Sequence, residues 1–197
     1  MHFQESQLFF MLTLLILPFG EMRAENSLNI SNVSANAGES GVHCFISATN
    51  DEPIEGFALG VQYPIPELVL TGADFTDTAV LDLLSGNQPD FAGIQIDSNN
   101  GTMTAGVIFG YGSLGQAPPA LDASPAIPQT LMRLTFSVSN EALPGTLPLQ
   151  LVDGLGDPGI DNVLSAGGFT IVPILNDGSF TVNNQHILSF DPLLAAP

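Results

Sequence analysis

Three aspartates in one short loop come nearest to a chemical site by their spacing. Asp153, Asp157 and Asp161 lie in DGLGDPGIDN, where glycine and proline favour turns over regular structure. Hard cations such as Ca²⁺ take oxygen ligands from loops of this kind, although the spacing is not that of an EF-hand. Calcium usually needs about six to eight oxygens, and few are visible here. A solvated acidic loop is therefore favoured, with Ca²⁺ binding as the alternative and no other cofactor expected.

Residues for nucleophilic or acid–base catalysis are poorly represented. Cys44 is the single cysteine, and it alternates with Val42 and Ile46, which predicts a buried thiol on the inward face of a strand. His43 falls on the polar face of the same strand and is expected at the surface. Neither zinc-ligand spacing nor a G-x-S-x-G elbow occurs. A carboxylate pair of the glycosidase type stays open among the 20 Asp and Glu residues, but no motif marks one.

Short alternating segments separated by turns must position these residues. Apolar and polar side chains alternate in 41–48, 54–63, 91–98 and 131–138, as in half-buried β-strands. The sequence Asn-Asn-Gly at 99–101 is a strong hairpin signal between two such runs. With 20 glycines and 15 prolines, this spacing predicts an all-β chain folded as an antiparallel β-sandwich.

Two segments depart from the strand pattern. Residues 76–86, TDTAVLDLLSG, could form one or two turns of helix. Residues 115–128, GQAPPALDASPAIP, are expected to be a loop, because proline cannot donate a hydrogen bond to a β-ladder.

The charge balance excludes two classes of partner. The chain has 20 Asp and Glu against 2 Lys and Arg, a formal net charge of -18. Such a surface is repelled by phosphate backbones and by anionic lipid headgroups, so we expect neither nucleic-acid nor membrane binding. Hydrophobic residues make up 45% of the chain, which is enough for a substantial core.

The N-terminus predicts export. The apolar run 8–20 is short for a membrane span and is followed by a small residue, Ala24, at a plausible cleavage point. We expect a signal peptide over 1–24, a single domain over 25–185 and a tail over 186–197. The protein would then be extracellular or at the cell surface. An uncleaved anchor or a misassigned start is the alternative.

Arg133 is the only cation after residue 24. It alternates with Met132 and Leu134, so it is expected on the outward face of its strand. We expect an ion pair with an acid on a neighbouring strand, worth less than about 1 kcal/mol if exposed.

Four segments, in this order, resemble the cohesin family over about residues 28–183. They are NAGESGVHCFISA, IEGFALGVQYPIPELVLTG, LMRLTFSVSNEALPGTLPLQL and ILNDGSFTV. In the second of them, Tyr63 and Leu68 take the Tyr and Leu positions of the family's signature. The resemblance implies a jelly-roll sandwich of about nine strands, related to the cellulose-binding modules, without catalytic activity.

The resemblance also implies a protein partner. Cohesins hold dockerin-bearing proteins, often polysaccharide-degrading enzymes, through one sheet face, here the strands near 56–63, 91–97, 102–109 and 146–152. The outward positions expected on this face are small or uncharged for the most part: Ala58, Gly60, Gln62, Gln95, Asp97 and Gln150.

Three functions follow from the sequence, in order of preference. The first is a secreted, non-catalytic cohesin-like module that binds a protein partner, with dockerin-bearing secreted enzymes as the implied class. The second is a carbohydrate-binding module of the same architecture that binds a polysaccharide. Sugar sites usually use exposed aromatics, and Trp is absent here. The third is a secreted hydrolase.

Overall fold

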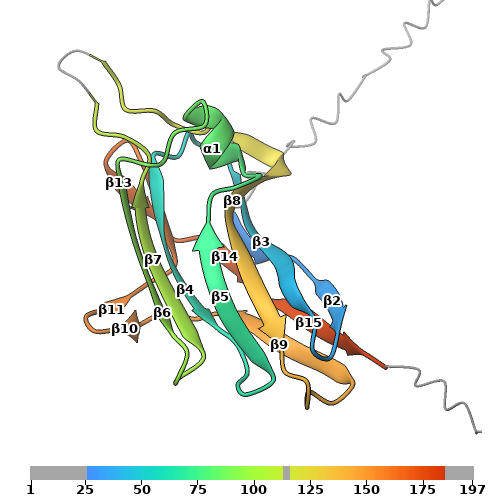
Figure 1. The fold of residues 1–197 in the computed structure, drawn as a ribbon. Coiled ribbons are helices and arrows are strands. Elements are labelled where there is room, and N and C mark those ends of the chain that lie inside the picture. Colours follow the sequence, from blue (N-terminus) through green and yellow to red (C-terminus); the bar gives the residue numbers. More distant parts are fainter. Residues whose placement is uncertain (1–25, 113–115, 185–197) are drawn as a thin grey trace, which may run out of the picture.

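Two β-sheets packed face to face make up the computed structural model, which describes residues 26–112 and 116–184 (Figure 1). One short helix, α1 (Ala79–Leu83), lies at one end of the sandwich. The strands are β1 (Ser27–Ile30), β2 (Val33–Asn36), β3 (Ser40–Asn50), β4 (Gly56–Gln62), β5 (Leu68–Asp74), β6 (Phe91–Asp97), β7 (Thr102–Ile108), β8 (Ser124–Val138), β9 (Gly145–Leu151), β10 (Leu155–Gly156), β11 (Gly159–Ile160), β12 (Val163–Ala166), β13 (Phe169–Ile171), β14 (Ile174–Asn176) and β15 (Gly178–Asn183).

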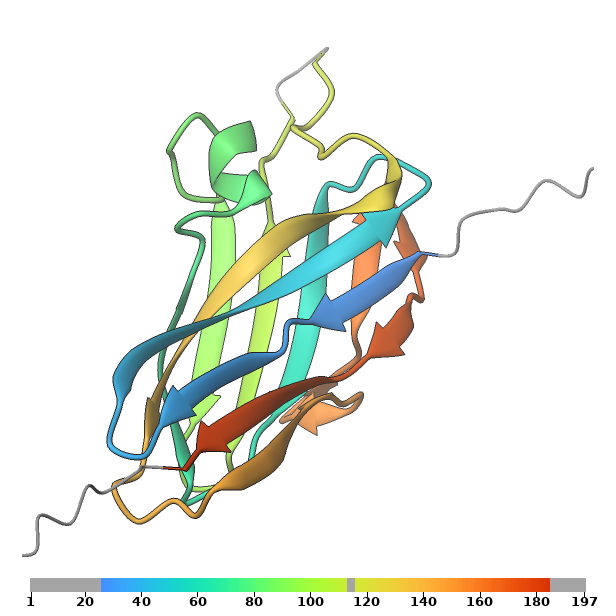
Figure 2. The same ribbon diagram turned by 90° about the vertical axis from the view of Figure 1, so that its right-hand side faces the viewer.

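The first sheet has the order β14-β1-β3-β8-β5. In the second sheet β4 pairs with β7 on one side, and β6 forms the edge beyond β7. The other side of β4 pairs with β9 and then with β12, and β9 continues through β15 to β2. Figure 2 shows the strands of the first sheet crossing in front of those of the second. The layers confirm the expected β-sandwich.

The first and last strands are each divided between the two sheets. β1 lies in the first sheet and β2 in the second, and β14 and β15 divide in the same way. Counting each divided pair as one strand gives nine long strands in the described residues, plus the short strands β10 to β13. The two chain ends meet as the parallel pairs β1–β14 and β15–β2, so the sandwich is mixed and not purely antiparallel.

The core lies between the sheets and follows the predicted alternation. Phe136 of β8 is fully buried and makes edge-to-face contacts with Tyr63 and Phe180, with ring centroids 5.6 and 5.9 Å apart. These contacts join the two sheets. Cys44 is also fully buried, as predicted, and burial raises the pKa of its thiol.

Both local predictions for residues 76–101 are confirmed. Thr78 caps α1, because its hydroxyl accepts a hydrogen bond from the amide of Leu81 at 3.3 Å. Asn-Asn-Gly forms the β6–β7 turn, where Gly101 takes a φ of 64° that favours glycine.

The predicted loop 115–128 was wrong in its second half. β8 begins at Ser124 and includes two prolines. The β3–β8 pairing is irregular here, since Ser124 pairs with Asn50 and the next pair is Gln129 with Ala48. Pro125 and Pro128 therefore lie where no regular ladder hydrogen bond is required.

Arg133 lies opposite Asp74 on the outer side of the first sheet. Its guanidinium contacts the carboxylates of Asp74 at 3.0 Å and Asp77 at 3.3 Å, which confirms the predicted cross-strand ion pair.

The expected signal peptide over 1–24 and the tail over 186–197 lie outside the described residues. Within the described part, no helix has the length and apolarity needed to cross a membrane.

Candidate binding face

The outward side of β9, β4, β7 and β6 forms the candidate face, and strand register arranges its side chains in rows. Gln62 of β4 lies opposite Gln150 of β9 on one side and Thr102 of β7 on the other. Thr102 in turn lies opposite Asp97 of β6. Three predicted binding residues, Gln62, Asp97 and Gln150, are therefore brought together in one exposed row.

The next two rows carry the other predicted residues. Gly60, Thr104 and Gln95 form the second row. Ala58, Gly106 and Gly93 form the third, which is almost without side chains.

A hairpin interrupts the edge of this sheet. Between β9 and β12, which pair with the same side of β4, residues 153–161 leave the sheet and fold back as β10 and β11; we refer to them as the flap hairpin. Figure 1 shows it projecting beside β6 and β7. A turn-rich sequence makes this departure easy, because glycine at 154 and 156 adopts positive φ angles.

Hydrogen bonds hold the base of the flap hairpin to β4. Oδ1 of Asp153 accepts from the amide and the side-chain nitrogen of Asn162, at 2.8 and 2.9 Å. These bonds lower the pKa of the Asp153 carboxyl, and the bond from the Asn162 backbone amide contributes most to this shift. Asn162 is buried, and its Oδ1 accepts a 2.9 Å hydrogen bond from the amide of Gly60.

Gly60 is consequently not available as a contact residue. The flap hairpin covers it, and a side chain at this position would collide with the carbonyl oxygen of Val152 and lie 3.4 Å from the Leu155 side chain. The expectation that Gly60 belongs to the exposed face was wrong. The alternation of side chains along the strand predicted correctly that Gly60 lies on the outward side. It could not show that a segment about ninety residues later in the chain covers this position.

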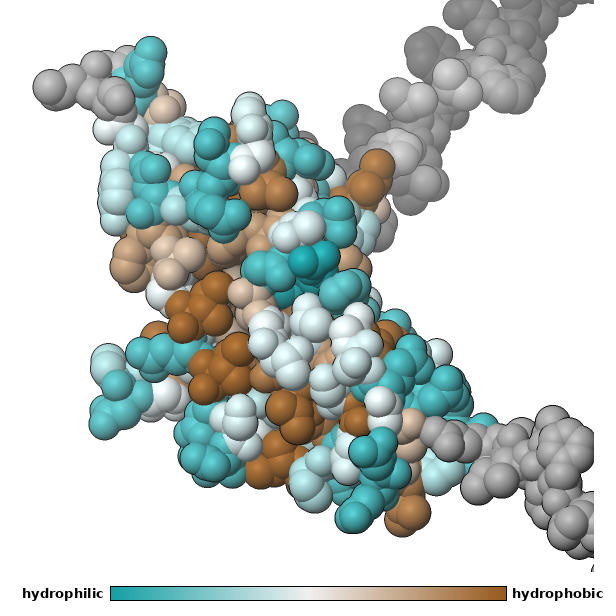
Figure 3. All heavy atoms as spheres, in the orientation of Figure 1, coloured by the Kyte–Doolittle hydropathy of each residue, from teal (hydrophilic) through white to brown (hydrophobic). Residues whose placement is uncertain are grey.

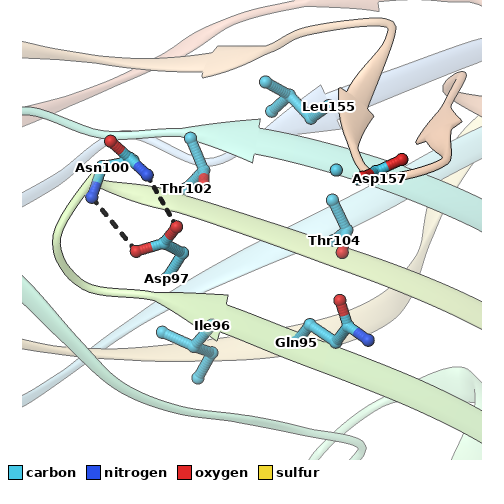
Figure 4. Close-up of a pocket in the computed structure, with 9 residues that line it drawn as sticks. Gln95, Ile96, Asp97, Asn100, Thr102, Thr104, Leu155 and Asp157 are labelled. Atoms are coloured by element: carbon cyan, nitrogen blue, oxygen red, sulfur yellow. Dashed lines mark hydrogen bonds between the residues drawn. The ribbon is translucent and has the colours of Figure 1, made fainter.

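An open groove of about 800 Å³ lies between the flap hairpin and strands β6 and β7 (Figure 4). Its polar walls come from Gln95, Asp97, Asn100, Thr102, Thr104 and Asp157. A second hollow of about 230 Å³ shares Gln95, Thr104 and Asp157 with it. This hollow continues over Gly93 and Gly106 to Phe91, with Pro158 and Ile160 of the flap hairpin opposite. Figure 3 shows the flap hairpin standing out from the surface, which is hollowed beside it.

Among the described residues that line the groove, acidic side chains occur and cationic ones do not. Asp97 accepts hydrogen bonds from Nδ2 of Asn100 at 2.7 Å and from the Asn99 amide at 3.0 Å, which lower the pKa of its carboxyl. Asp157 adds a second exposed carboxylate. The single Lys or Arg in the described residues, Arg133, lies in the other sheet.

The three aspartates proposed for Ca²⁺ have different surroundings. Asp153 is committed to Asn162, Asp157 lines the groove, and Asp161 is exposed. Across residues 26–112 and 116–184, no group of three His, Cys, Asp or Glu side chains lies close enough to hold a metal ion. Calcium binding stays a prediction, and these three aspartates do not form a common set of ligands.

Sequence reasoning missed the aromatic residue of this face. Phe91 shares the outward side of β6 with Gly93, Gln95 and Asp97, and its side chain is 48% exposed. The alternation that placed Gln95 and Asp97 outward also places Phe91 there, so extending it to the start of the strand would have found it. No comparable pattern in the sequence predicted that the flap hairpin would lie against this face.

Solved structures with a similar fold include cohesin–dockerin complexes. A chain of the complex between CaCohA2 and a variant of CaDoc0917, solved at pH 5.5, has a TM-score of 0.61 and 13% identity, covering 80% of this chain and 99% of that chain. The third cohesin of ScaC from Acetivibrio cellulolyticus, solved with the ScaB dockerin, has a TM-score of 0.60 and 14% identity, covering 81% and 99%. Coh-OlpA with Doc918 from Clostridium thermocellum has a TM-score of 0.59 and 12% identity, covering 80% and 99%.

No protein-family model matches the sequence, and no curated protein matches it either. The fold therefore defines the class: a jelly-roll β-sandwich with one sheet face bordered by a flap hairpin. Nearly the full length of each compared chain is covered, and the fold is that of cohesin domains.

Proposed function

We propose that this chain is a non-catalytic module that binds a protein partner of the dockerin type through the candidate face. The observation that carries the proposal is the fold, shared with cohesins that were solved together with dockerins. The exposed row of Gln62, Asp97 and Gln150 offers hydrogen-bonding groups on the outer side of the sheet, which suits a protein partner. Dockerin-bearing enzymes that act on polysaccharides are the partner class that the cohesin resemblance implies.

Export is part of the same proposal. The apolar run 8–20 and the small residue Ala24 support a cleaved signal peptide. The protein would then act outside the cell or at its surface, where dockerin-bearing enzymes could be bound.

Two titratable side chains, His43 and Asp97, bear on the hydrolase alternative. His43 lies exposed on the first sheet, away from the groove, and its Nδ1 is 3.2 Å from the Thr135 hydroxyl. Asp97 has a lowered pKa, whereas the general acid of a glycosidase needs a raised one. Neither residue therefore supplies the general acid that the hydrolase alternative requires.

A binding assay with charge-introducing variants tests the proposal. The full-length chain is immobilised and exposed to a panel of dockerin modules and to the proteins that its host secretes. We expect Gln62→Arg to weaken capture at least about tenfold, because it places a long cationic side chain in the middle of the exposed row, between Gln150 and Thr102. Val69→Arg is the matched control, since Val69 is 43% exposed on the other sheet. Retention of no partner at all would contradict the proposal.

Carbohydrate binding is a second candidate, favoured by one observation. Phe91 presents an exposed aromatic ring next to the polar side chains of the groove. The absence of Trp from the sequence made this candidate weaker, but Phe91 supplies the aromatic surface that such a site needs.

A further inference from the structure

We propose that the groove under the flap hairpin is a binding site for a neutral oligosaccharide. Phe91 would be the stacking platform, and Gln95, Thr104 and Asp157 would bind the sugar hydroxyls. The inference specifies the site and ligand class for the second candidate function and rests on that candidate alone. It does not require the dockerin-type partner.

The position of the Phe91 ring makes it a platform. Its Cζ lies 3.2 Å from the point where a Cβ of residue 93 would stand, and its Cε1 lies 3.9 Å from the corresponding point at residue 106. The ring therefore lies over two glycines, in space that side chains would otherwise fill. Because about half of Phe91 remains exposed, its free surface can pack against the C–H groups of a sugar ring.

Polar side chains beside this platform are uncommitted. Among the described residues, Gln95, Thr104 and Asp157 make no side-chain hydrogen bond, although all three line both parts of the groove. An amide, a hydroxyl and a carboxylate together offer donors and acceptors, which matches hydroxyl groups that both donate and accept. Bonds to the Asp157 carboxylate would be charge-assisted and stronger than neutral ones.

The flap hairpin adds a wall beside β6 and β7 and so makes the site concave. Gly156 approaches β7 closely, since a Cβ there would stand 3.5 Å from Cγ2 of Thr104. Pro158 and Ile160 form the wall facing the glycines. Phe91 lines the smaller hollow, of about 230 Å³, which shares Gln95, Thr104 and Asp157 with the larger part of the groove. That larger part, about 800 Å³, is within the roughly 300–1,000 Å³ usual for small-ligand sites.

Charge selects the class of sugar. Asp97 and Asp157 lie in the groove, and Arg133, the single described cation, is bound to Asp74 and Asp77 on the other sheet. Uronic acids and sulfated sugars would be repelled, because none of the described residues that line the groove is a Lys or Arg that could offset their charge. An uncharged glycan meets no such repulsion.

Affinity electrophoresis of the full-length chain tests this site. Native gels contain xylan, glucomannan, xyloglucan or mixed-linkage β-glucan, with polygalacturonate as the anionic comparison. We expect retardation by at least one neutral polysaccharide and none by polygalacturonate. Phe91→Ala should lower the affinity obtained from the retardation at least about tenfold. Phe91→Tyr should retain it, because a ring remains over the glycines.

Phe169→Ala is the matched control, since Phe169 is 78% exposed but lies on β13, outside the groove. Its retardation should equal that of the unchanged chain. Asp157→Asn should weaken retardation less than Phe91→Ala does. Circular dichroism of each variant checks that the fold is intact.

Three outcomes would overturn the proposal. They are no retardation in any neutral polysaccharide, retardation that Phe91→Ala leaves unchanged, and loss of a captured protein partner in Phe91→Ala without any glycan binding. The last result would assign the groove to the protein-binding face. Because the dockerin assay is separate, capture of a partner without retardation would remove this inference and leave the protein-binding function standing.

Discussion

Glycines on the candidate face serve two different purposes at the residue scale. Gly60 admits the backbone just before the flap hairpin, where the Val152 amide donates a 2.9 Å hydrogen bond to the Gly60 carbonyl. Gly93 instead leaves room for the Phe91 ring. The same residue type on the same face therefore holds a structural element in one place and exposes an aromatic surface in the other.

Gly60→Ala should destabilise the protein. The added methyl group would collide with the backbone carbonyl of Val152, which cannot move as a side-chain end can, so we expect a cost of about 1–3 kcal/mol. Urea unfolding followed by circular dichroism measures it. Gly72→Ala is the control, since its Cβ would meet nothing nearer than Thr135 at 4.0 Å and the change should stay within about 0.5 kcal/mol. Equal effects of the two substitutions would contradict the assignment of Gly60.

The Asp74–Arg133 pair should make stability depend on pH. Partial burial raises the pKa of Asp74, but hydrogen bonds from Arg133 and Thr76 outweigh it and leave the pKa below its ordinary value. The stabilisation is thus present above the ordinary pKa and is lost as pH falls through the lowered one. Because the Asp74 side chain is 42% exposed, the contribution should stay below about 1 kcal/mol and shrink in high salt.

Urea unfolding at neutral and acidic pH, at low and high salt, tests this expectation. Asp74→Asn should be less stable than the unchanged chain near neutral pH and equal to it at acidic pH. Asp82→Asn, in α1 and outside the ion pairs of Arg133, serves as the comparison. A difference that persists unchanged at acidic pH would show that Asp74 stabilises by other means than its charge.

At the scale of elements, the flap hairpin depends on its base. Asn162 joins it to β4 through Gly60, and Asp153 orients Asn162. The pairing of β9 and β12 with the same edge of β4 keeps both ends of the flap hairpin in the sheet. The groove wall is therefore fixed by hydrogen bonds that lie outside the groove.

Asn162→Ala should loosen this base. The buried amide of Gly60 would lose its acceptor, which costs about 1–3 kcal/mol when no water replaces it. Limited proteolysis should then cut within 153–161 faster than in the unchanged chain. Asp161→Ala, an exposed neighbour, should leave both stability and cleavage unchanged. Unaltered cleavage in Asn162→Ala would mean that strand pairing with β4 and the packing of Leu155 hold the hairpin without the Asn162 side chain.

At the scale of the whole molecule, aromatic contacts in the core and pairing of the terminal strands hold the two sheets together. Phe136, Tyr63 and Phe180 connect the two sheets in the core. The pairs β1–β14 and β2–β15 bring the start and end of the described chain together in both sheets. The two sheets should therefore unfold together in a single transition.

Phe136→Ala should cost about 3–5 kcal/mol, because it leaves a cavity between two aromatic neighbours. Differential scanning calorimetry should show one transition at a lower Tm. If this variant does not fold, Phe136→Leu should still lower the Tm. Phe169→Ala, at an exposed position, should stay within about 0.5 kcal/mol of the unchanged chain. Two separate transitions would contradict a single core.

The sequence by itself determined the strands and the directions of their side chains. Alternation of apolar and polar residues is a local property, so it placed Cys44 inward, Arg133 outward and Gln62, Gln95 and Asp97 on one face. The Asn-Asn-Gly turn and the capped helix were also local and were predicted correctly.

Only the tertiary structure decided what meets that face. The flap hairpin covers Gly60, the terminal strands divide between the sheets, and β8 begins at Ser124 despite its prolines. Each depends on pairing between segments far apart in the chain, and a residue's own neighbours do not specify such pairing. Alternation gives the side of a strand on which Gly60 lies, whereas contact with Val152 decides that this side is covered.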